Sequence, residues 1–311
     1  MSKKKRTDYE NEQPKINRIS KKTNFIFSAI FFLLALICVV PVVYIIIISF
    51  SSSESIAAKG YSFFPDSLTL EAYQYLWNNK VMILKAFGVS ATVTITGTIV
   101  GLFLTSSMGY VLTRSKFKLK GLLTWVVFIP MVFGGGLVST YNVYTTVLGL
   151  KDSVWVLILP MAVSSFHVII AKTFIRTTIP QSIFESAEID GASQLRIYFQ
   201  MVIPLSKPLL ATIGLLLSFG YWNDWWLSLM YIDSRDLYSL QAVLMSIERN
   251  IEYLAQNANT MGISSAQYAA TMPKESMRMA MAVLIVVPIA CVYPFFQRYF
   301  VSGLTIGSVK E

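Results

Sequence analysis

The sequence is short of charged residues. Only 14% of its 311 residues are Asp, Glu, Lys or Arg, where soluble domains have about 25%, and 54% are hydrophobic. This composition excludes an ordinary soluble enzyme and a disordered chain. Lys and Arg exceed Asp and Glu by 26 to 17, but the excess lies in short stretches between long apolar runs. That distribution is typical of membrane proteins rather than of nucleic-acid-binding domains.

Residues that build metal and redox sites are scarce as well. The two cysteines, Cys38 and Cys291, lie within apolar runs, which argues against a disulfide framework or a Cys-rich metal centre and favours small apolar packing residues. A single histidine, His167, cannot supply a set of metal ligands. The phosphate-binding patterns G-x-x-x-x-G-K-[ST] and G-x-G-x-x-G are also missing. We therefore expect no metal site, no catalytic residue and no bound ATP in this chain.

Long apolar runs take the place of these features. A helix needs roughly 20 mostly apolar residues to cross a hydrocarbon core about 30 Å thick. Six runs qualify and predict an all-α membrane protein with six transmembrane helices, at residues 24–50, 86–112, 122–144, 153–171, 208–232 and 279–300. The first run is longer than a signal-peptide core of about 7–15 residues. We expect it to be retained, although the small residues at 51–53 leave cleavage open.

The basic residues predict the orientation of the spans. With the N-terminus inside, most Lys and Arg fall in the tail 1–23, between the second and third spans, in a loop at about 172–207 and in the tail 301–311. Cytoplasmic segments carry this basic excess, so both termini are expected in the cytoplasm. The outer loop at about 233–278 has apolar residues at helical spacing. It is interpreted either as a helix lying on the protein or bilayer surface, or as a docking surface for an extracellular partner.

Small residues recur every fourth position in the second predicted span. Gly97, Gly101, Thr105 and Gly109 form a small-xxx-small pattern, which lets helices approach closely. We interpret it as a packing surface, with a sliding gate as the alternative.

The loop at 172–207 predicts two short amphipathic helices. Pro180 suits the start of the first helix, Gly191 ends it because glycine adopts left-handed backbone freely, and Ser193 can cap the second. Pro204 is expected to end that second helix. The residues expected to share an apolar face are Ile183, Phe184 and Ala187 in the first helix, and Leu195, Tyr198, Phe199 and Val202 in the second.

The acids of this loop indicate what it binds. A helix lying on lipid headgroups favours Lys and Arg on its polar face, whereas this loop has Glu185, Glu188 and Asp190. Apolar and acidic residues presented together to the cytoplasm suit a groove on a protein partner. We therefore favour a partner-binding element over an interfacial helix.

The spacing of three segments resembles the EAA loop of ABC-importer permeases. These segments are Glu185-Ser186-Ala187, Asp190-Gly191-Ala192 and Ile203-Pro204-Leu205, with Ser186 in place of the middle alanine. Four further segments, 134–141, 221–225, 293–300 and 306–310, are similar to carbohydrate-importer permeases of the LplC-like branch of the MalG superfamily. The resemblance extends from about residue 24 to residue 311.

The resemblance implies a permease subunit in a prokaryotic cell membrane that imports a sugar or oligosaccharide. Its partners would be a homologous second permease, forming a heterodimer, two ATPase subunits that bind ATP and Mg, and an extracellular solute-binding protein. Seven residues would couple this chain to the ATPase: Glu185, Ser186, Ala187, Asp190, Gly191, Ala192 and Pro204. Our hypothesis is that Glu185 and Asp190 form charge-assisted hydrogen bonds with ATPase donors.

A second set of residues is a candidate for the translocation pathway: Tyr141, His167, Trp222, Asn223, Asp224 and Trp225. Asp224 is the only acid in a predicted span, and such acids usually face a bundle interior or a wet cavity. The aromatic residues around it either contact or gate a sugar, or form an interfacial belt beside a helix cap. His167 is interpreted either as a hydrogen-bonded packing residue or as a pathway residue.

Two other classes of function compete with the importer. A secondary transporter or channel that works without ATP would require charged or broken-helix sites near the membrane midplane, often within internal repeats. The predicted spans are nearly free of charge there and show no repeat. A membrane-embedded enzyme would need a catalytic or metal-ligand cluster, and the spans contain none.

Overall fold

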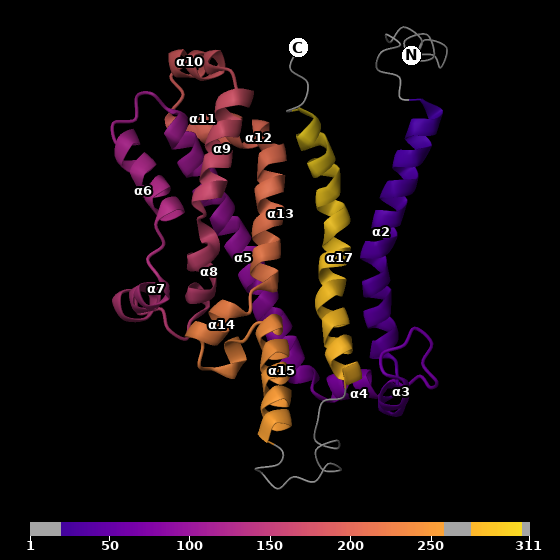
Figure 1. The fold of residues 1–311 in the computed structure, drawn as a ribbon. Helices are drawn as coiled ribbons and strands as arrows, with labels where there is room; N and C mark the ends of the chain where they lie inside the picture. The colour runs from indigo at the N-terminus through magenta and orange to yellow at the C-terminus, as the bar shows by residue number, and fades with distance from the viewer. Residues whose placement is uncertain (1–19, 258–274, 307–311) are drawn as a thin grey trace.

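The computed structural model describes residues 20–257 and 275–306 of the chain (Figure 1). Within these ranges the chain is helical, and extended pairing is limited to one isolated bridge between Ser51 and Leu68. Most of the predicted tail 1–23, the end of the tail 301–311 and the segment 258–274 of the predicted outer loop lie outside the described residues. The described part is thus nearly all-α, as the composition predicts.

Among the described residues, three helices are long and apolar enough to cross a membrane: α2 (Lys21–Ser49), α5 (Lys80–Thr113) and α17 (Glu275–Ile306), the last through its part Glu275–Pro294. Their length follows from continuous apolar sequence without interior charge clusters. The 34 residues of α5 extend over about 51 Å at 1.5 Å per residue. This helix therefore continues well beyond the predicted span at 86–112.

The remaining predicted spans are bent or interrupted. Helices α8 (Val154–Ala162) and α9 (Ser165–Thr178) meet at an angle of 50°, and counting bent pairs as single spans gives up to five candidates in the described part of the chain. The predicted span at 122–144 is divided into α6 (Lys120–Val132), α7 (Leu137–Asn142) and the π-helix η2 (Val143–Val147). The six-span arrangement stays a prediction.

Two of the broken spans are interrupted at residues that the sequence marks. Between α6 and α7 the chain passes through three consecutive glycines, and Gly136 has φ +77°, a backbone conformation that glycine adopts without strain. The predicted span 208–232 divides into α13 (Lys207–Asn223) and α14 (Trp226–Tyr231). Its break lies at Asp224, which is consequently not inside a continuous helix.

The small residues of α5 form its packing surface. A Cβ atom added to Gly97 would lie 2.5 Å from the Tyr221 ring of α13, and one added to Gly109 would lie 2.7 Å from Ala171 Cβ of α9. Thr105, between them in the pattern, is fully buried. The packing interpretation of the small-xxx-small pattern is confirmed, and α5 is the central helix on which α8, α9 and α13 pack.

The connecting elements lie at two opposite ends of the bundle (Figure 1). At one end are the helices of the loop between α9 and α13, namely α10 (Gln181–Ile189), α11 (Gln194–Ile197), η3 (Tyr198–Val202) and α12 (Ile203–Leu205). At the other end are α3 (Ser53–Lys59), α4 (Glu71–Asn78), η4 (Arg235–Leu237) and α15 (Leu240–Asn257). Helix α2 begins and α17 ends on the same side as α10.

Helix α15 confirms the helical spacing predicted for the segment after residue 233. Leu240 and Val243 are buried, and Leu244 and Ile247 are half-buried, in a cluster that includes residues of α4, α5 and α17. The apolar face therefore packs on the protein itself. The predicted pattern also includes Ile251 and Leu254, whose side chains lie outside what the structure describes.

Candidate functional site

The segment from α10 to α12, called here the two-helix loop (residues 181–205), contains the residues expected to couple the chain to a partner. Its first helix follows Pro180, whose fixed φ of −58° precedes Gln181. The helix ends in a Schellman motif: Ala192 N donates to Ala187 O at 2.9 Å and Gly191 N donates to Glu188 O at 3.1 Å. Gly191 has φ +75°. The predicted left-handed turn at Gly191 is confirmed.

The second helix differs from its expected form. Ser193 caps it, because its Oγ accepts a hydrogen bond from Arg196 N at 3.3 Å, as predicted. Its apolar face was predicted only in part: Tyr198 and Val202 are buried as expected, together with Ile197, whereas Leu195 and Phe199 are 71% and 54% exposed. The face that packs is therefore the one centred between Ile197 and Val202, and the π-helix η3 (Tyr198–Val202) lies within it.

Pro204 does not end this helix, contrary to the prediction. It lies in α12, and the bend of 81° before α13 comes after Leu205. Helix α12 continues directly from the π-helix and ends at Leu205, one residue after Pro204. Pro204 therefore lies at the end of the two-helix loop, just before the bend into α13.

The apolar face of α10 packs on the end of α5. Phe184 and Ala187 are buried, and the Arg114 guanidinium lies 3.7 Å from the centroid of the Phe184 ring and 5.3 Å from that of Tyr110. Arg114 Nη2 also donates to Gln181 Oε1 at 3.4 Å. A planar guanidinium suits such stacking. Arg114 thus connects the N-terminal half of α10 to α5.

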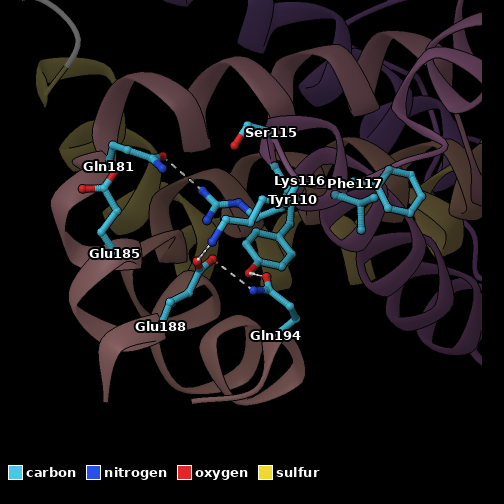
Figure 2. A pocket seen from close by; sticks show the side chains of 10 residues that line it. Tyr110, Ser115, Lys116, Phe117, Gln181, Glu185, Glu188 and Gln194 are labelled. Atoms are coloured by element: carbon cyan, nitrogen blue, oxygen red, sulfur yellow. Dashed lines mark hydrogen bonds and ion pairs between the residues drawn. The ribbon is translucent and has the colours of Figure 1, made fainter. Parts of the chain in front are cut away.

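A chain of polar contacts connects the other half of α10 to the same helix (Figure 2). Tyr110 donates to Gln194 Oε1 at 2.7 Å, Gln194 Nε2 donates to Glu188 Oε1 at 3.2 Å, and Lys116 Nζ pairs with Glu188 Oε2 at 2.7 Å. A cavity of about 410 Å³ lies among these side chains. The hydrogen bonds from Lys116, then from Gln194, lower the pKa of Glu188, and the bond to Glu188 raises the pKa of Lys116.

We expect Lys116→Gln to raise the pKa of Glu188 toward its ordinary value of 4.5. A lowered carboxyl pKa means that the pairing contributes stability above pH 4.5 and loses it as the pH falls through the lowered pKa. The pair should thus be intact at neutral pH. Titration of the ¹³C carboxyl signals of the full chain in nanodiscs measures the shift, and Glu188→Gln assigns the signal. An unchanged midpoint in Lys116→Gln would contradict the ion pair.

The opposite side of the two-helix loop is exposed. Its outer face, as we call it, consists of Ile189, Asp190, Leu195 and Phe199, whereas the exposed Glu185 lines the 410 Å³ cavity beside Glu188. Ile189 is 86% exposed, and neither Glu185 nor Asp190 forms an ion pair within the described residues. Exposed apolar side chains beside unpaired carboxylates are the composition of a protein-binding surface.

The seven expected coupling residues therefore have two kinds of environment. Glu185, Ser186, Asp190, Gly191 and Pro204 are exposed. Ala187 is buried and Ala192 is half-buried, and the Schellman hydrogen bond joins their backbones. Small residues at these two positions let α10 lie close to its neighbours. The structure thus separates residues that can face a partner from residues that shape the turn.

The candidate pathway residues do not form one cluster. Trp222 borders a groove of about 420 Å³ between α5, α13 and α17, and its Nε1 donates to Ile285 O at 3.1 Å. Asn223 accepts a hydrogen bond from Gln241 at 3.2 Å. Tyr141 stacks on Tyr231 at 5.4 Å between ring centroids. No described contact joins Tyr141 or His167 to the groove beside Trp222.

The local contacts of Asp224 and His167, two of the candidate pathway residues, bear on their alternative interpretations. Asp224 Oδ2 accepts a hydrogen bond from Leu227 N at 3.2 Å, which caps α14, and Trp225 packs edge-on against Trp226. These contacts favour the helix-cap interpretation of Asp224. His167 is half-buried, and its Nδ1 has no hydrogen-bond partner among the described residues, so the expected hydrogen-bonded packing role is wrong for that atom.

The sequence analysis missed the residues on which the two-helix loop docks. Arg114 and Lys116 were considered only as charges that indicate orientation, and Tyr110, Gln181 and Gln194 were not considered. Arg114 and Lys116, just after α5, are about 70 positions away in the sequence from the residues of α10 that they contact. A pattern within one segment contains no signal for such a pairing.

Comparisons with known proteins cover nearly the whole chain. The protein LplC of Bacillus subtilis (strain 168) is 38% identical over 274 residues, which are 88% of this chain and 90% of that protein. The polygalacturonan/rhamnogalacturonan transport system permease protein YtcP of the same organism is 37% identical over 276 residues, 89% of this chain and 94% of that protein. No protein-family model matches the sequence.

A solved structure has the same fold. It is a bacterial ABC transporter involved in the import of the acidic polysaccharide alginate, and one of its chains matches with a TM-score of 0.74 and 23% identity over 93% of this chain and all of that chain. The extent of identity to LplC and YtcP, the helical fold and the docked two-helix loop agree with the resemblance seen in the sequence. This chain belongs to the family of sugar-transport permeases of ABC importers.

Proposed function

We propose that this chain is the transmembrane permease subunit of an ATP-driven importer for a sugar or oligosaccharide. It would form the translocation pathway with a homologous second permease and receive solute from an extracellular binding protein. Two ATPase subunits would bind ATP and Mg²⁺ and contact the two-helix loop. The seven residues from Glu185 to Pro204 named above would provide the coupling.

The observation that carries this proposal is the two-sided structure of the two-helix loop. Its inner side contacts the end of α5 and the residues just after it through Arg114, Lys116 and Tyr110, while Glu185 and Asp190 are exposed and form no ion pair within the described residues. A partner that moves the outer face would therefore pull directly on α5, the central packing helix. This is the arrangement that a transporter needs to convert motion of an ATPase into motion of its helices.

The distribution of charge supports the proposed orientation, with six spans and both termini in the cytoplasm. Basic residues occur in or beside the elements at the end of the bundle that contains α10, where α2 begins and α17 ends (Figure 1). They are Arg114, Lys116, Lys118, Lys120, Lys172, Arg176, Arg196 and Lys207. An excess of Lys and Arg is typical of the cytoplasmic side of a bacterial membrane protein.

The groove beside Trp222 is our candidate for the pathway surface. It is lined by α5, α13 and α17, and Thr94, Thr98 and Ser218 contribute the hydroxyl groups among its mainly apolar side chains. In the proposed heterodimer the second permease would cover the side of the groove that α5, α13 and α17 leave open. The outer end of the groove would contain Trp222, Asn223, Asp224 and Trp225. Tyr141 and His167 lie on other helices, which do not line this groove.

Site-specific cross-linking tests the contact with the ATPase. In a chain with Cys38 and Cys291 replaced by serine, Ile189→Cys in the assembled transporter is expected to cross-link to an ATPase subunit. The matched control is Phe64→Cys, which lies between α3 and α4 at the other end of the bundle and is 85% exposed, like Ile189 at 86%. Only Ile189→Cys should give the adduct. Equal adducts, or none from Ile189→Cys in an ATPase-containing complex, would contradict the proposal.

A further inference from the structure

A basic cavity of about 530 Å³ lies at the end of the bundle near α10. Its cationic side chains come from two helices and one helix end: Arg114 after α5, Lys120 of α6, and Lys172 and Arg176 of α9. None of the residues that line it is Asp or Glu. Four cations that converge on one cavity repel one another unless an anion lies among them.

Arg114 shows where an anion is needed. Its side chain is only 9% exposed, its Nε has no hydrogen-bond partner, and it forms no ion pair with any described residue. Its contacts are two rings and one bond to Gln181, so this buried charge has no direct ion pair, and Glu188, the acid near enough to interact with it electrostatically, is already paired with Lys116. Buried charges in proteins are normally paired. The cavity is therefore complementary to an anion in both charge and hydrogen-bond donors.

An apolar groove of about 430 Å³ adjoins the basic cavity. It runs between α6 and α9, is lined by Val127, Phe128 and Ile169, and shares Lys172 and Arg176 with the cavity. A soluble anion such as phosphate needs only the cations. A molecule with an anionic head and a hydrocarbon chain fits both features at once.

We propose that this site binds an anionic phospholipid of the inner leaflet, with its phosphate group in the basic cavity and an acyl chain in the groove. Basic pockets between helices on the cytoplasmic side suit such headgroups, and guanidinium groups bind phosphate through charge-assisted hydrogen bonds. The proposal relies on the cytoplasmic orientation proposed above. Because Arg114 also stacks on Phe184 of α10, the lipid phosphate would contact the same side chain that holds the two-helix loop on α5.

Native mass spectrometry of the purified full-length chain tests this site, with dioleoyl phosphatidylglycerol and dioleoyl phosphatidylcholine as probes. The chain should retain phosphatidylglycerol in preference to phosphatidylcholine. Each basic residue near a lipid surface contributes enough to change the affinity by about fivefold, so Lys120→Gln/Lys172→Gln should weaken phosphatidylglycerol binding by about 25-fold. The matched control Lys118→Gln removes an exposed lysine that lines neither cavity, and should leave the affinity unchanged.

Equal retention of the two lipids by the unaltered chain would overturn the proposal, and so would equal phosphatidylglycerol affinities in the double variant and in Lys118→Gln. Displacement of phosphatidylglycerol by millimolar inorganic phosphate would also overturn it, because it would identify a soluble anion as the occupant. Lys120→Arg/Lys172→Arg keeps the charges and should keep the affinity, which distinguishes lost charge from misfolding. The readout needs neither ATP nor an ATPase. Its failure is therefore distinct from failure of the cross-link at Ile189.

Discussion

Arg114→Ala is expected to reduce ATP-driven solute uptake by at least tenfold while ATP hydrolysis by the partner subunits continues. The guanidinium lies 3.7 Å from the Phe184 ring and also contacts Tyr110 and Gln181. A desolvated cation–π contact contributes roughly 2 kcal/mol, so its loss should shift the docking of α10 on α5 by about 30-fold. The outer face would then still bind the ATPase but would no longer move α5.

The initial rate of uptake into proteoliposomes and the rate of ATP hydrolysis, measured on the same preparation, give the coupling ratio. Lys116→Ala is the matched control, because its side chain is 84% exposed and exposed ion pairs contribute little. We expect less than about a twofold change from it. The effect of Arg114→Ala should persist in vesicles of phosphatidylcholine alone, which separates docking from lipid binding. Full coupling in Arg114→Ala would show that the link to Phe184 is dispensable.

Gly97→Val is expected to prevent α5 and α13 from packing, with loss of most of the folded chain. The new Cβ would lie 2.5 Å from Tyr221, whose buried hydroxyl donates to Ile158 O at 2.7 Å. Overpacking costs about 1–3 kcal/mol, and leaving that buried hydroxyl unpaired costs about 1–3 kcal/mol more. These two costs together are a large part of the free energy of unfolding of an ordinary domain, which is about 5–15 kcal/mol.

Thermal unfolding of the detergent-solubilised chain, with the yield of monodisperse protein, measures this effect. Gly88→Val in the same helix is the control, since a Cβ at Gly88 meets nothing within 4 Å. That variant should unfold at the temperature of the unaltered chain. Gly97→Val/Tyr221→Ala removes the ring and should regain part of the lost stability. Equal unfolding temperatures for the two valine variants would contradict the packing geometry.

Features that depend on neighbouring residues were predictable. The apolar runs predict helices because a buried or lipid-exposed backbone must satisfy its own hydrogen bonds. The turn at Gly191 and the cap at Ser193 are local as well, since each needs only the hydrogen bonds of one helix end. The spacing of Gly97 and Gly109 indicates a packing face without indicating which helix packs there. The relationship to sugar-transport permeases was also readable at this level.

Features that depend on contacts between distant segments were not predictable. Leu195 and Phe199 are exposed, although they belong to the expected apolar face, because the helix packs through Ile197, Tyr198 and Val202 instead, and Tyr198 bonds to Ser106 of α5 at 2.7 Å. Asp224 reads as an acid inside a span until the break between α13 and α14 makes it a helix cap. In both cases packing decides between backbone forms of similar energy.

The amino-acid sequence by itself determined the class of the protein, the positions of its apolar helices and the turn chemistry of the two-helix loop, because helix formation and capping act over a few residues. Only the tertiary structure decided that Arg114, Lys116 and Tyr110 hold this loop on α5, and that Lys120, Lys172 and Arg176 join Arg114 around one cavity. These side chains come from separate helices. Their charges and rings meet only once α5, α6, α9 and α10 have packed, so the energy that places them is not present in any single segment.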